Sequence, residues 1–161
     1  MTAAVITVSD SCHRGTRADR SGPAVAAALR VKGFEVLATE IVPDSQVKIS
    51  AAIKRLAKRA QLVVTTGGTG VTERDVTPEA TRAVCDRLVD GVAERMRAEG
   101  MKKTPLAALG RGLCGTISHS LVLNLPGSPA GATESLAAVI DLLPHALELL
   151  RGKTAHAEPS R

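Results

Sequence analysis

Short apolar runs typical of β-strands alternate with segments of helical spacing along most of the sequence, and this alternation constrains the fold more than any other feature. The strand-like runs lie at residues 5–8, 34–42, 62–65, 113–117 and 121–125. Strands separated by helices predict an α/β fold, in which a sheet carries helices on both faces. In such a sheet, ligands bind beyond the carboxyl ends of the strands.

The intervening segments carry helix start and stop signals. A helix at residues 23–32 is expected to end at Gly33, and either Asp44 or Ser45 is expected to cap the next one. Thr77 is expected to cap a further helix, with Pro78 at its first position. Ser128-Pro129 opens a long helix, in which Pro144 predicts a kink or a break. Apolar side chains mark the helical faces: Ile49, Ile53, Leu56 and Ala60; then Leu88, Val92 and Met96; then Leu136, Ile140, Leu143, Leu147 and Leu150.

The length of 161 residues fits one domain of ordinary size. We expect a single domain at residues 1–151 and a polar tail at residues 152–161. The sequence has no Trp, no Tyr and one Phe, Phe34, so the core must consist of aliphatic side chains. A bound flat ring must then rest on backbone, aliphatic and polar groups, because aromatic stacking is not available.

The net charge of +5 suggests anionic partners. No aromatic residues interleave with the basic ones, and the basic residues are scattered, so a nucleic-acid binder is the poorer interpretation. Cys12, Cys85 and Cys114 are widely spaced and predict neither a disulfide framework nor a zinc site. No apolar run approaches the roughly 20 residues of a membrane span. We therefore expect a cytoplasmic protein without nucleic-acid or membrane partners.

A glycine-rich loop, Thr65–Gly70, follows the third predicted strand. Three glycines let backbone amides approach an anion closely, but the same residues also suit a tight turn with positive φ. No Gly-Lys-Ser/Thr follows, so the loop is not a Walker phosphate loop. From the residues alone, the anion site and the turn are equally good interpretations.

Two aspartates follow strands at the same predicted edge of the sheet. Asp75, just after the glycine loop, is a candidate ligand for a magnesium ion that bridges phosphates. Asp44 follows Pro43 after the second strand. From the residues alone, a helix cap is the better explanation of each aspartate. The polar loop at residues 9–22 and the turn at residues 125–129 offer further polar groups, and no histidine is assigned a catalytic role.

These segments together resemble the Mog/MoaB family of molybdenum-cofactor biosynthesis proteins, which includes the G domain of gephyrin. The matching residues are Val8-Ser9-Asp10-Ser11, Arg14-Gly15, Asp19-x-Ser21-Gly22-Pro23, Pro43-Asp44, Thr65-Thr66-Gly67-Gly68-Thr69-Gly70, Arg74-Asp75-Val76-Thr77-Pro78-Glu79-Ala80-Thr81 and Asn124-Leu125-Pro126-Gly127-Ser128-Pro129. The string from Arg74 to Thr81 after the glycine loop is specific to this family and its relatives, and the matches span about residues 5–150.

The resemblance implies a three-layer α/β/α molybdopterin-binding fold with a mostly parallel sheet, assembled as a homotrimer. It also implies adenylyl transfer from Mg-ATP to molybdopterin, with Asp44 and Asp75 as the catalytic and Mg²⁺-binding residues. A molybdenum-insertion protein is an implied partner. The implied residues for molybdopterin and ATP are Ser9, Asp10, Arg14, Gly15, Asp19, Ser21, Gly22, Thr66, Gly67, Gly68, Thr69, Gly70, Glu79, Asn124, Pro126, Gly127 and Ser128.

The chain departs from some bacterial adenylyltransferases of the family, because it lacks an insertion before the last helix. MoaB-type members share this compact form. The alternative function is therefore a non-catalytic molybdopterin-binding or scaffolding protein, and the retained Asp44 favours the enzyme.

Overall fold

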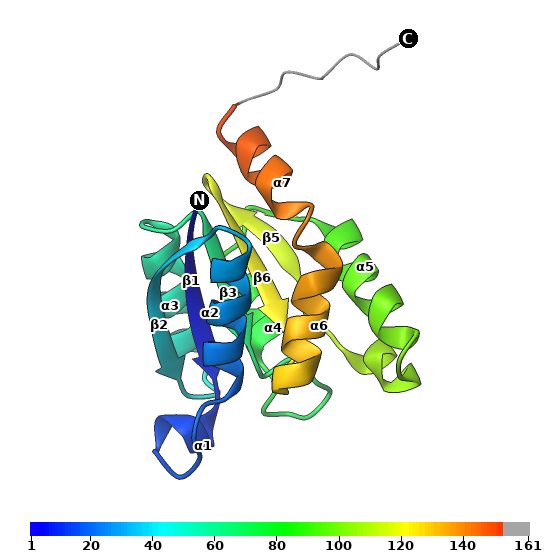
Figure 1. Cartoon of the computed structure of the whole chain (residues 1–161). Coiled ribbons are helices and arrows are strands. Elements are labelled where there is room, and N and C mark those ends of the chain that lie inside the picture. The colour runs from blue at the N-terminus through cyan, green and yellow to red at the C-terminus, as the bar shows by residue number, and fades with distance from the viewer. Residues whose placement is uncertain (153–161) are drawn as a thin grey trace.

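The computed structural model describes residues 1–152 and contains one six-stranded sheet with helices on both of its faces (Figure 1). The predicted tail at residues 152–161 lies outside the described residues except for Gly152. The elements are β1 Thr2–Val8, α1 Asp10–His13, α2 Ser21–Val31, β2 Glu35–Val42, α3 Gln46–Ala57, β3 Leu62–Thr66, α4 Thr77–Arg82, β4 Arg87–Leu88, α5 Asp90–Met101, the 3-10 helix η1 Pro105–Leu109, β5 Cys114–Ile117, β6 Ser120–Leu125, α6 Pro129–Val139 and α7 Leu143–Leu150.

The sheet has the strand order β2-β1-β3-β6-β5-β4. The neighbouring strands β2, β1, β3 and β6 run parallel to one another, and the β6–β5 and β5–β4 pairs are antiparallel. Helices α2, α5, α6 and α7 pack on one face, and α3 and α4 pack on the other (Figure 1). Val5 of β1 belongs to the first core cluster and Ile6 to the second, because successive side chains of a strand point to opposite faces. The predicted three-layer fold with a mostly parallel sheet is confirmed.

The parallel strands end at one edge of the sheet, which lies at the bottom of Figure 1. Val8 of β1 is paired with Val42 of β2, Thr7 with Thr66 of β3, and Thr66 with Leu125 of β6. The register therefore brings together the four segments that follow these strands, as the sequence analysis expected.

The starts of two helices, α4 and α5, differ from those that the local sequence pattern predicts. Leu88 was placed on the same helix as Val92, but it belongs to β4, where it pairs with Gly115. This pairing with a strand distant in sequence overrides the helical spacing, and α5 begins after it. Thr77 is not an N-cap: it is the first residue of α4, and its hydroxyl donates to the Gly67 carbonyl at 2.9 Å.

Other boundaries agree with the sequence or differ slightly. The expected loop at residues 9–22 contains the short helix α1, capped by the Ser9 hydroxyl, which accepts from the Cys12 amide at 3.2 Å. The long C-terminal helix is broken into α6 and α7, and Pro144 lies in the first turn of α7, so the predicted break is confirmed. None of the helices within residues 1–152 is long and apolar enough to span a bilayer.

Candidate functional site

The loop that follows β3 requires glycine at positions 67 and 68. Gly67 has φ 101° and Gly68 has φ 65°, in the region that favours glycine. A Cβ atom at Gly67 would lie less than 3.0 Å from the Val8 carbonyl oxygen, closer than real Cβ atoms come. Within the described residues, the amides of Gly68 and Thr69 have no hydrogen-bond acceptor. The loop is therefore both a tight turn that requires glycine and a place where backbone amides remain available for a ligand.

Asp44 lies against this loop and is not the cap of α3. Ser45 is the N-cap, since its hydroxyl accepts from the Lys48 amide. Asp44 Oδ2 accepts from the Asp10 amide at 2.8 Å, and Asp10 Oδ1 accepts from the Asp44 amide at 2.9 Å. Asp44 Oδ1 lies 3.4 Å from the place that a Cβ of Gly68 would occupy. The carboxylate is thus held at the glycine loop by a reciprocal pair of hydrogen bonds.

Asp75 lies against the other end of the loop and does not cap α4. Its Oδ2 accepts from the Thr72 amide at 3.0 Å and from the Thr72 hydroxyl at 2.6 Å, and it lies 2.8 Å from the position of a Cβ on Gly70. Partial burial raises the pKa of the Asp75 carboxyl, but the Thr72 hydrogen bonds and the positive charge of Arg111 outweigh it, so the pKa lies below its ordinary value. Asp75 is therefore ionised near neutral pH.

An ion pair joins Asp10, the partner of Asp44, to Arg74, the residue before Asp75. Arg74 Nη2 lies 2.5 Å from Asp10 Oδ2, and Asp10 is the residue that clasps Asp44. The hydrogen bond from the Asp44 amide, followed by that from Arg74, lowers the pKa of the Asp10 carboxyl. The segments after β1, β2 and β3 are thereby joined through polar contacts.

Asp19 organises the loop that precedes α2. Its Oδ2 accepts from the Thr7 hydroxyl at 2.7 Å, and its Oδ1 accepts from the Gly22 amide at 3.0 Å. A Cβ on Gly22 would overlap both Thr7 and Asp19. The Asp19 contact explains why α2 starts at Ser21, two residues before the predicted start at Pro23. Both carboxylate oxygens of Asp19 thus accept hydrogen bonds from the protein itself.

The turn after β6 packs on the glycine loop. A Cβ on Gly127 would lie 3.2 Å from the Gly67 Cα, and the Thr66 hydroxyl donates to the Pro126 carbonyl at 2.7 Å. Ser128 caps α6 by accepting from the Gly131 amide at 3.1 Å. The glycine loop therefore has the end of β1 on one side and the turn after β6 on the other.

Two adjoining cavities lie on either side of this arrangement. The smaller, of about 390 Å³, is mostly polar and includes Asp44, Arg17 and Arg20. The larger, of about 970 Å³, lies between α5, η1 and α6 and includes Asp75. Gly68, Gly127 and Ser128 contribute to both cavities. Their sizes suit small-molecule ligands.

The structure brings together most of the residues that the sequence analysis proposed as binding residues. Those in the smaller cavity are Ser9, Asp19, Ser21, Asp44, Thr66, Gly67, Gly68, Gly127 and Ser128. Those in the larger cavity are Gly68, Thr69, Gly70, Asp75, Asn124, Pro126, Gly127 and Ser128. Asp10, Arg14, Gly15, Gly22 and Glu79 line neither cavity.

Asn124 holds three segments together. Its amide nitrogen donates to the hydroxyls of Thr65 and Thr81, each at 2.9 Å, and its oxygen accepts from the Leu113 amide at 3.1 Å. The side chain is buried, and both of its N–H groups are used inside the protein. We conclude that Asn124 stabilises the site by holding together the segments of Thr65, Thr81 and Leu113.

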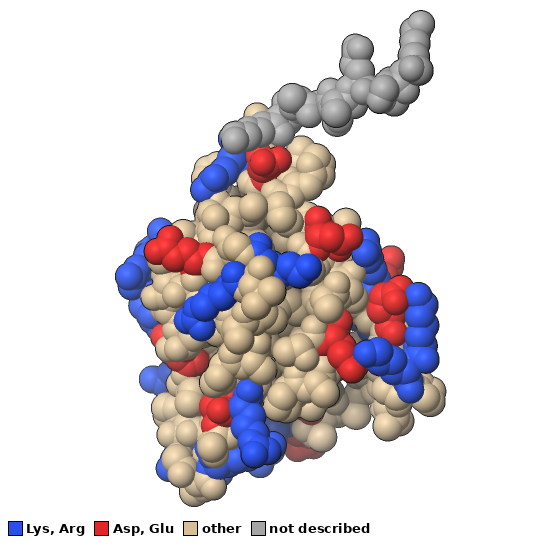
Figure 2. Space-filling view, viewed as in Figure 1, with Lys and Arg blue, Asp and Glu red and all other residues tan. Residues whose placement is uncertain are grey.

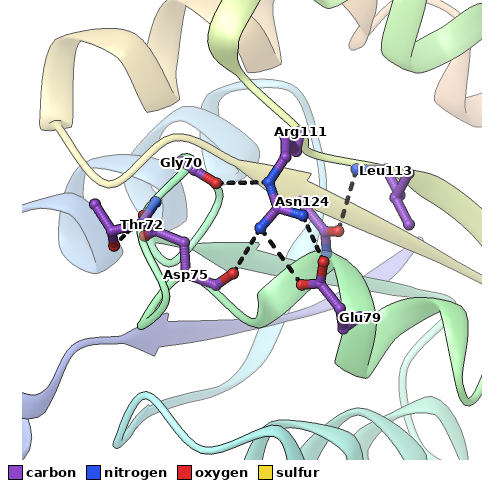
Figure 3. Close-up of polar contacts among 7 residues, drawn as sticks. All are labelled: Gly70, Thr72, Asp75, Glu79, Arg111, Leu113 and Asn124. Atoms are coloured by element: carbon purple, nitrogen blue, oxygen red, sulfur yellow. Dashed lines mark hydrogen bonds and ion pairs between the residues drawn. The ribbon is translucent and has the colours of Figure 1, made fainter.

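Several basic residues at or near the cavities were not proposed as binding residues, and Arg95, Arg97 and Lys103 of the larger cavity are among them. Arg17 and Arg20 line the smaller cavity, and the charge-rich loop that contains them was their only signal in the sequence. Arg111 contacts Gly70, Asp75 and Glu79 (Figure 3), and nothing in its sequence neighbourhood marks it except a glycine on each side. On the face shown in Figure 2, basic and acidic residues are interspersed, without an extended basic surface of the kind that nucleic-acid binders carry.

Comparisons with known proteins agree with this geometry. Residues 4–145 match the family described as probable molybdopterin binding domain. The molybdopterin adenylyltransferase of Helicobacter pylori (strain J99) is 38% identical over 152 residues, which cover 92% of this chain and 86% of that protein. The molybdenum cofactor synthesis protein cinnamon of Drosophila melanogaster is 39% identical over 157 residues, which are 93% of this chain but only 26% of that longer protein.

A comparison with a solved structure agrees with the family match. The molybdopterin biosynthesis enzyme MoaB from Thermus thermophilus superimposes with a TM-score of 0.88 at 49% identity, over 94% of this chain and 96% of that one. The family match covers most of the chain, and the matched relatives include an adenylyltransferase of nearly the same extent. The chain therefore belongs to the Mog/MoaB family of molybdopterin-binding proteins of molybdenum-cofactor biosynthesis.

Proposed function

We propose that this chain is a molybdopterin adenylyltransferase, which transfers AMP from Mg-ATP to the phosphate of molybdopterin. The observation that carries the proposal is the placement of Asp44 and Asp75 at the two ends of one glycine loop, each beside a different one of two adjoining cavities. A transfer between two substrates needs two ligand sites whose reacting ends meet. The similarity to the Helicobacter enzyme over most of both chains supports the same activity.

The donor groups at the loop suit magnesium. Asp44 and Asp75 each use Oδ2 for hydrogen bonds, and in the described part of the chain neither Oδ1 accepts one. Magnesium in nucleotide sites takes one or two carboxylates, with phosphate and water oxygens completing its coordination. Within residues 1–152, no cluster of three or more His, Cys, Asp or Glu side chains that could hold a metal ion is present. Asp44 and Asp75 would hold the ion, which would neutralise charge on the phosphates.

In the proposed reaction, a phosphate oxygen of molybdopterin forms a bond to the α-phosphorus of ATP. The bond between that phosphorus and the oxygen bridging to the β-phosphate breaks, and pyrophosphate leaves. The attacking phosphate is already an anion, so this chain need not supply a general base. Its residues act by position and charge: the free amides of Gly68 and Thr69 bind phosphate oxygens, and Arg17 and Arg20 add positive charge.

Pyrophosphate release from Mg-ATP with purified molybdopterin tests the proposal. We expect Asp44→Asn and Asp75→Asn each to lower turnover by about 100-fold or more while molybdopterin still binds. Asp90→Asn, which changes an exposed aspartate at the start of α5, is the matched control and should keep full turnover.

Normal turnover in either site variant would remove that aspartate from the mechanism. Tight molybdopterin binding by the wild type without pyrophosphate release would instead support the non-catalytic alternative. That alternative stays in the test because MoaB-type members of the family share the compact form of this chain.

We further propose that residues 1–151 form a single domain, and that the chain acts in the cytoplasm as a homotrimer that delivers its product to a molybdenum-insertion protein. The family resemblance is the basis for these proposals. Sedimentation at micromolar concentration tests the assembly, and a monomer would contradict it.

A further inference from the structure

Arg111 makes more contacts with the glycine loop and its neighbours than its place in the sequence suggests (Figure 3). Its Nε donates to the Gly70 carbonyl at 2.6 Å, and its Nη2 donates to the Asp75 carbonyl at 2.6 Å. Its own amide donates to the Thr69 carbonyl at 2.9 Å. One residue therefore binds three main-chain carbonyls of the segment that ends in Asp75.

The residues between Gly70 and Asp75 make few contacts of their own. Residues 71–74, between Gly70 and Asp75, are all exposed. Besides the Arg74–Asp10 ion pair, their hydrogen bonds within the described chain are those between Thr72 and Asp75. Thr77 joins the two ends of the wider segment, since its amide donates to the Gly68 carbonyl at 3.0 Å and its hydroxyl donates to the Gly67 carbonyl. Arg111 adds a second closure inside it, between Gly70 and Asp75. The orientation of the Asp75 carboxylate then depends on a contact to the main chain of Asp75.

Glu79 fixes the guanidinium from the other side. Arg111 Nη1 forms an ion pair with Glu79 Oε1, and Nη2 lies 3.5 Å from Oε2. Glu79 sits on α4, which starts two residues after Asp75. A planar guanidinium can serve the Gly70 carbonyl, the Asp75 carbonyl and a carboxylate at once, whereas a lysine ammonium is a point charge without this fork.

We infer that Arg111 is the positioning residue for Asp75, with Glu79 holding its guanidinium in place. The inference rests on the proposed function, since Asp75 acts there as a metal ligand. Arg111 lines neither cavity and contacts the main chain of Thr69, Gly70 and Asp75, so it acts by positioning the segment that carries Asp75. Its loss should weaken Mg-ATP use without weakening molybdopterin binding.

The experiment compares Arg111→Lys and Arg111→Gln with Arg55→Lys. Arg55 is a matched control because it forms a two-oxygen ion pair with Glu40, on α3 and β2, away from both cavities. Hydrogen–deuterium exchange of residues 70–77 reports on the loop directly. Calorimetric titration with Mg-ATP, for wild type, Arg111→Gln, Asp75→Asn and the double variant, reports on the coupling to Asp75. Turnover of Arg111→Lys gives kcat and KM separately.

We expect faster exchange at residues 70–77 in both Arg111 variants and unchanged exchange there in Arg55→Lys. Arg111→Gln should weaken Mg-ATP binding about 10-fold, with no further loss in the Asp75→Asn background. Arg111→Lys should lower kcat about 10- to 100-fold and leave the KM for molybdopterin within about 2-fold. This division between kcat and KM would not follow from a general loss of structure.

Three results would overturn the inference: unchanged exchange in Arg111→Gln, an additional loss of Mg-ATP binding when Arg111→Gln is added to Asp75→Asn, or wild-type kcat in Arg111→Lys. If wild-type protein released no pyrophosphate, the proposed function would fail. The exchange measurement would still decide whether Arg111 holds the loop.

Discussion

Replacing Gly67 by alanine adds two separate costs, and the structure supplies a control for each. Gly67 has φ 101°, and a Cβ there would approach the Val8 carbonyl to less than 3.0 Å. Holding a non-glycine residue at such a φ costs about 1–3 kcal/mol, and forcing an atom into packed backbone costs about 1–3 kcal/mol more. Gly33 has φ 82° with nothing within 4 Å of its Cβ position, so Gly33→Ala carries only the first cost. Gly91 has ordinary φ and open space, so Gly91→Ala should carry neither.

Urea unfolding followed by far-UV circular dichroism measures these differences, since the chain has no Trp or Tyr to serve as a fluorescent probe. With a urea m-value of about 2 kcal/mol/M, a loss of about 2–6 kcal/mol lowers the midpoint of Gly67→Ala by about 1–3 M. Gly33→Ala should lose about 0.5–1.5 M, and Gly91→Ala should match or exceed the wild type. A Gly67→Ala midpoint equal to or above that of Gly33→Ala would refute the close approach of the glycine loop to β1.

Other predictions concern buried polar groups, pH and thiols. Asn124→Ala leaves the Leu113 amide without its acceptor and should cost at least about 1–3 kcal/mol in the same urea assay, whereas unchanged stability would show that the site beneath the loop repacks. The folded pKa values of Asp10, Asp75 and Glu79 lie below their unfolded values, so these groups stabilise the fold above about pH 4.5, and that stability is lost as pH falls through the folded values. Thermal unfolding from pH 6 to pH 2.5 should show this loss, and a smaller loss in Asp10→Asn; an equal loss in the variant would contradict the assignment to Asp10. Burial raises the pKa of Cys114 to about 12 and of Cys85 to about 11, so at pH 8 a thiol reagent should modify both slowly in the native protein and rapidly in urea, and fast native labelling of Cys114 would contradict its burial.

The sequence predicted the sheet, its helices and the edge that carries the site, because these follow from local periodicity and from the direction of parallel strands. It left open whether Asp44 or Ser45 caps α3, since the deciding contact of Asp44 is with Asp10, 34 residues away. Leu88 was misplaced for the same kind of reason: its pairing with Gly115 of β5 outweighs its spacing from Val92.

Within the candidate site, Arg111 is the clearest example of a residue that the sequence alone does not identify. The acceptors of its guanidinium lie 32 to 41 residues earlier in the chain, at Gly70, Asp75 and Glu79, and no local pattern links them. Asp75 itself was found because it belongs to a recognisable string of residues, whereas the residue that holds it does not. A side chain such as Arg111, whose partners all lie far away in the sequence, is thus found only when the chain is folded.

The start of α2 and the start of α6 face the same smaller cavity but differ in electric field. The macrodipole of a helix places partial positive charge at its first turn. At α2 the Asp19 carboxylate accepts from the Gly22 amide and cancels much of this charge. At α6 the cap is the neutral Ser128 hydroxyl, and the first turn contains no acidic residue. The positive potential from helix ends therefore lies on the Ser128 wall, next to the glycine loop and on the side that the larger cavity shares, where it adds to the charges that Arg17 and Arg20 bring to the smaller cavity.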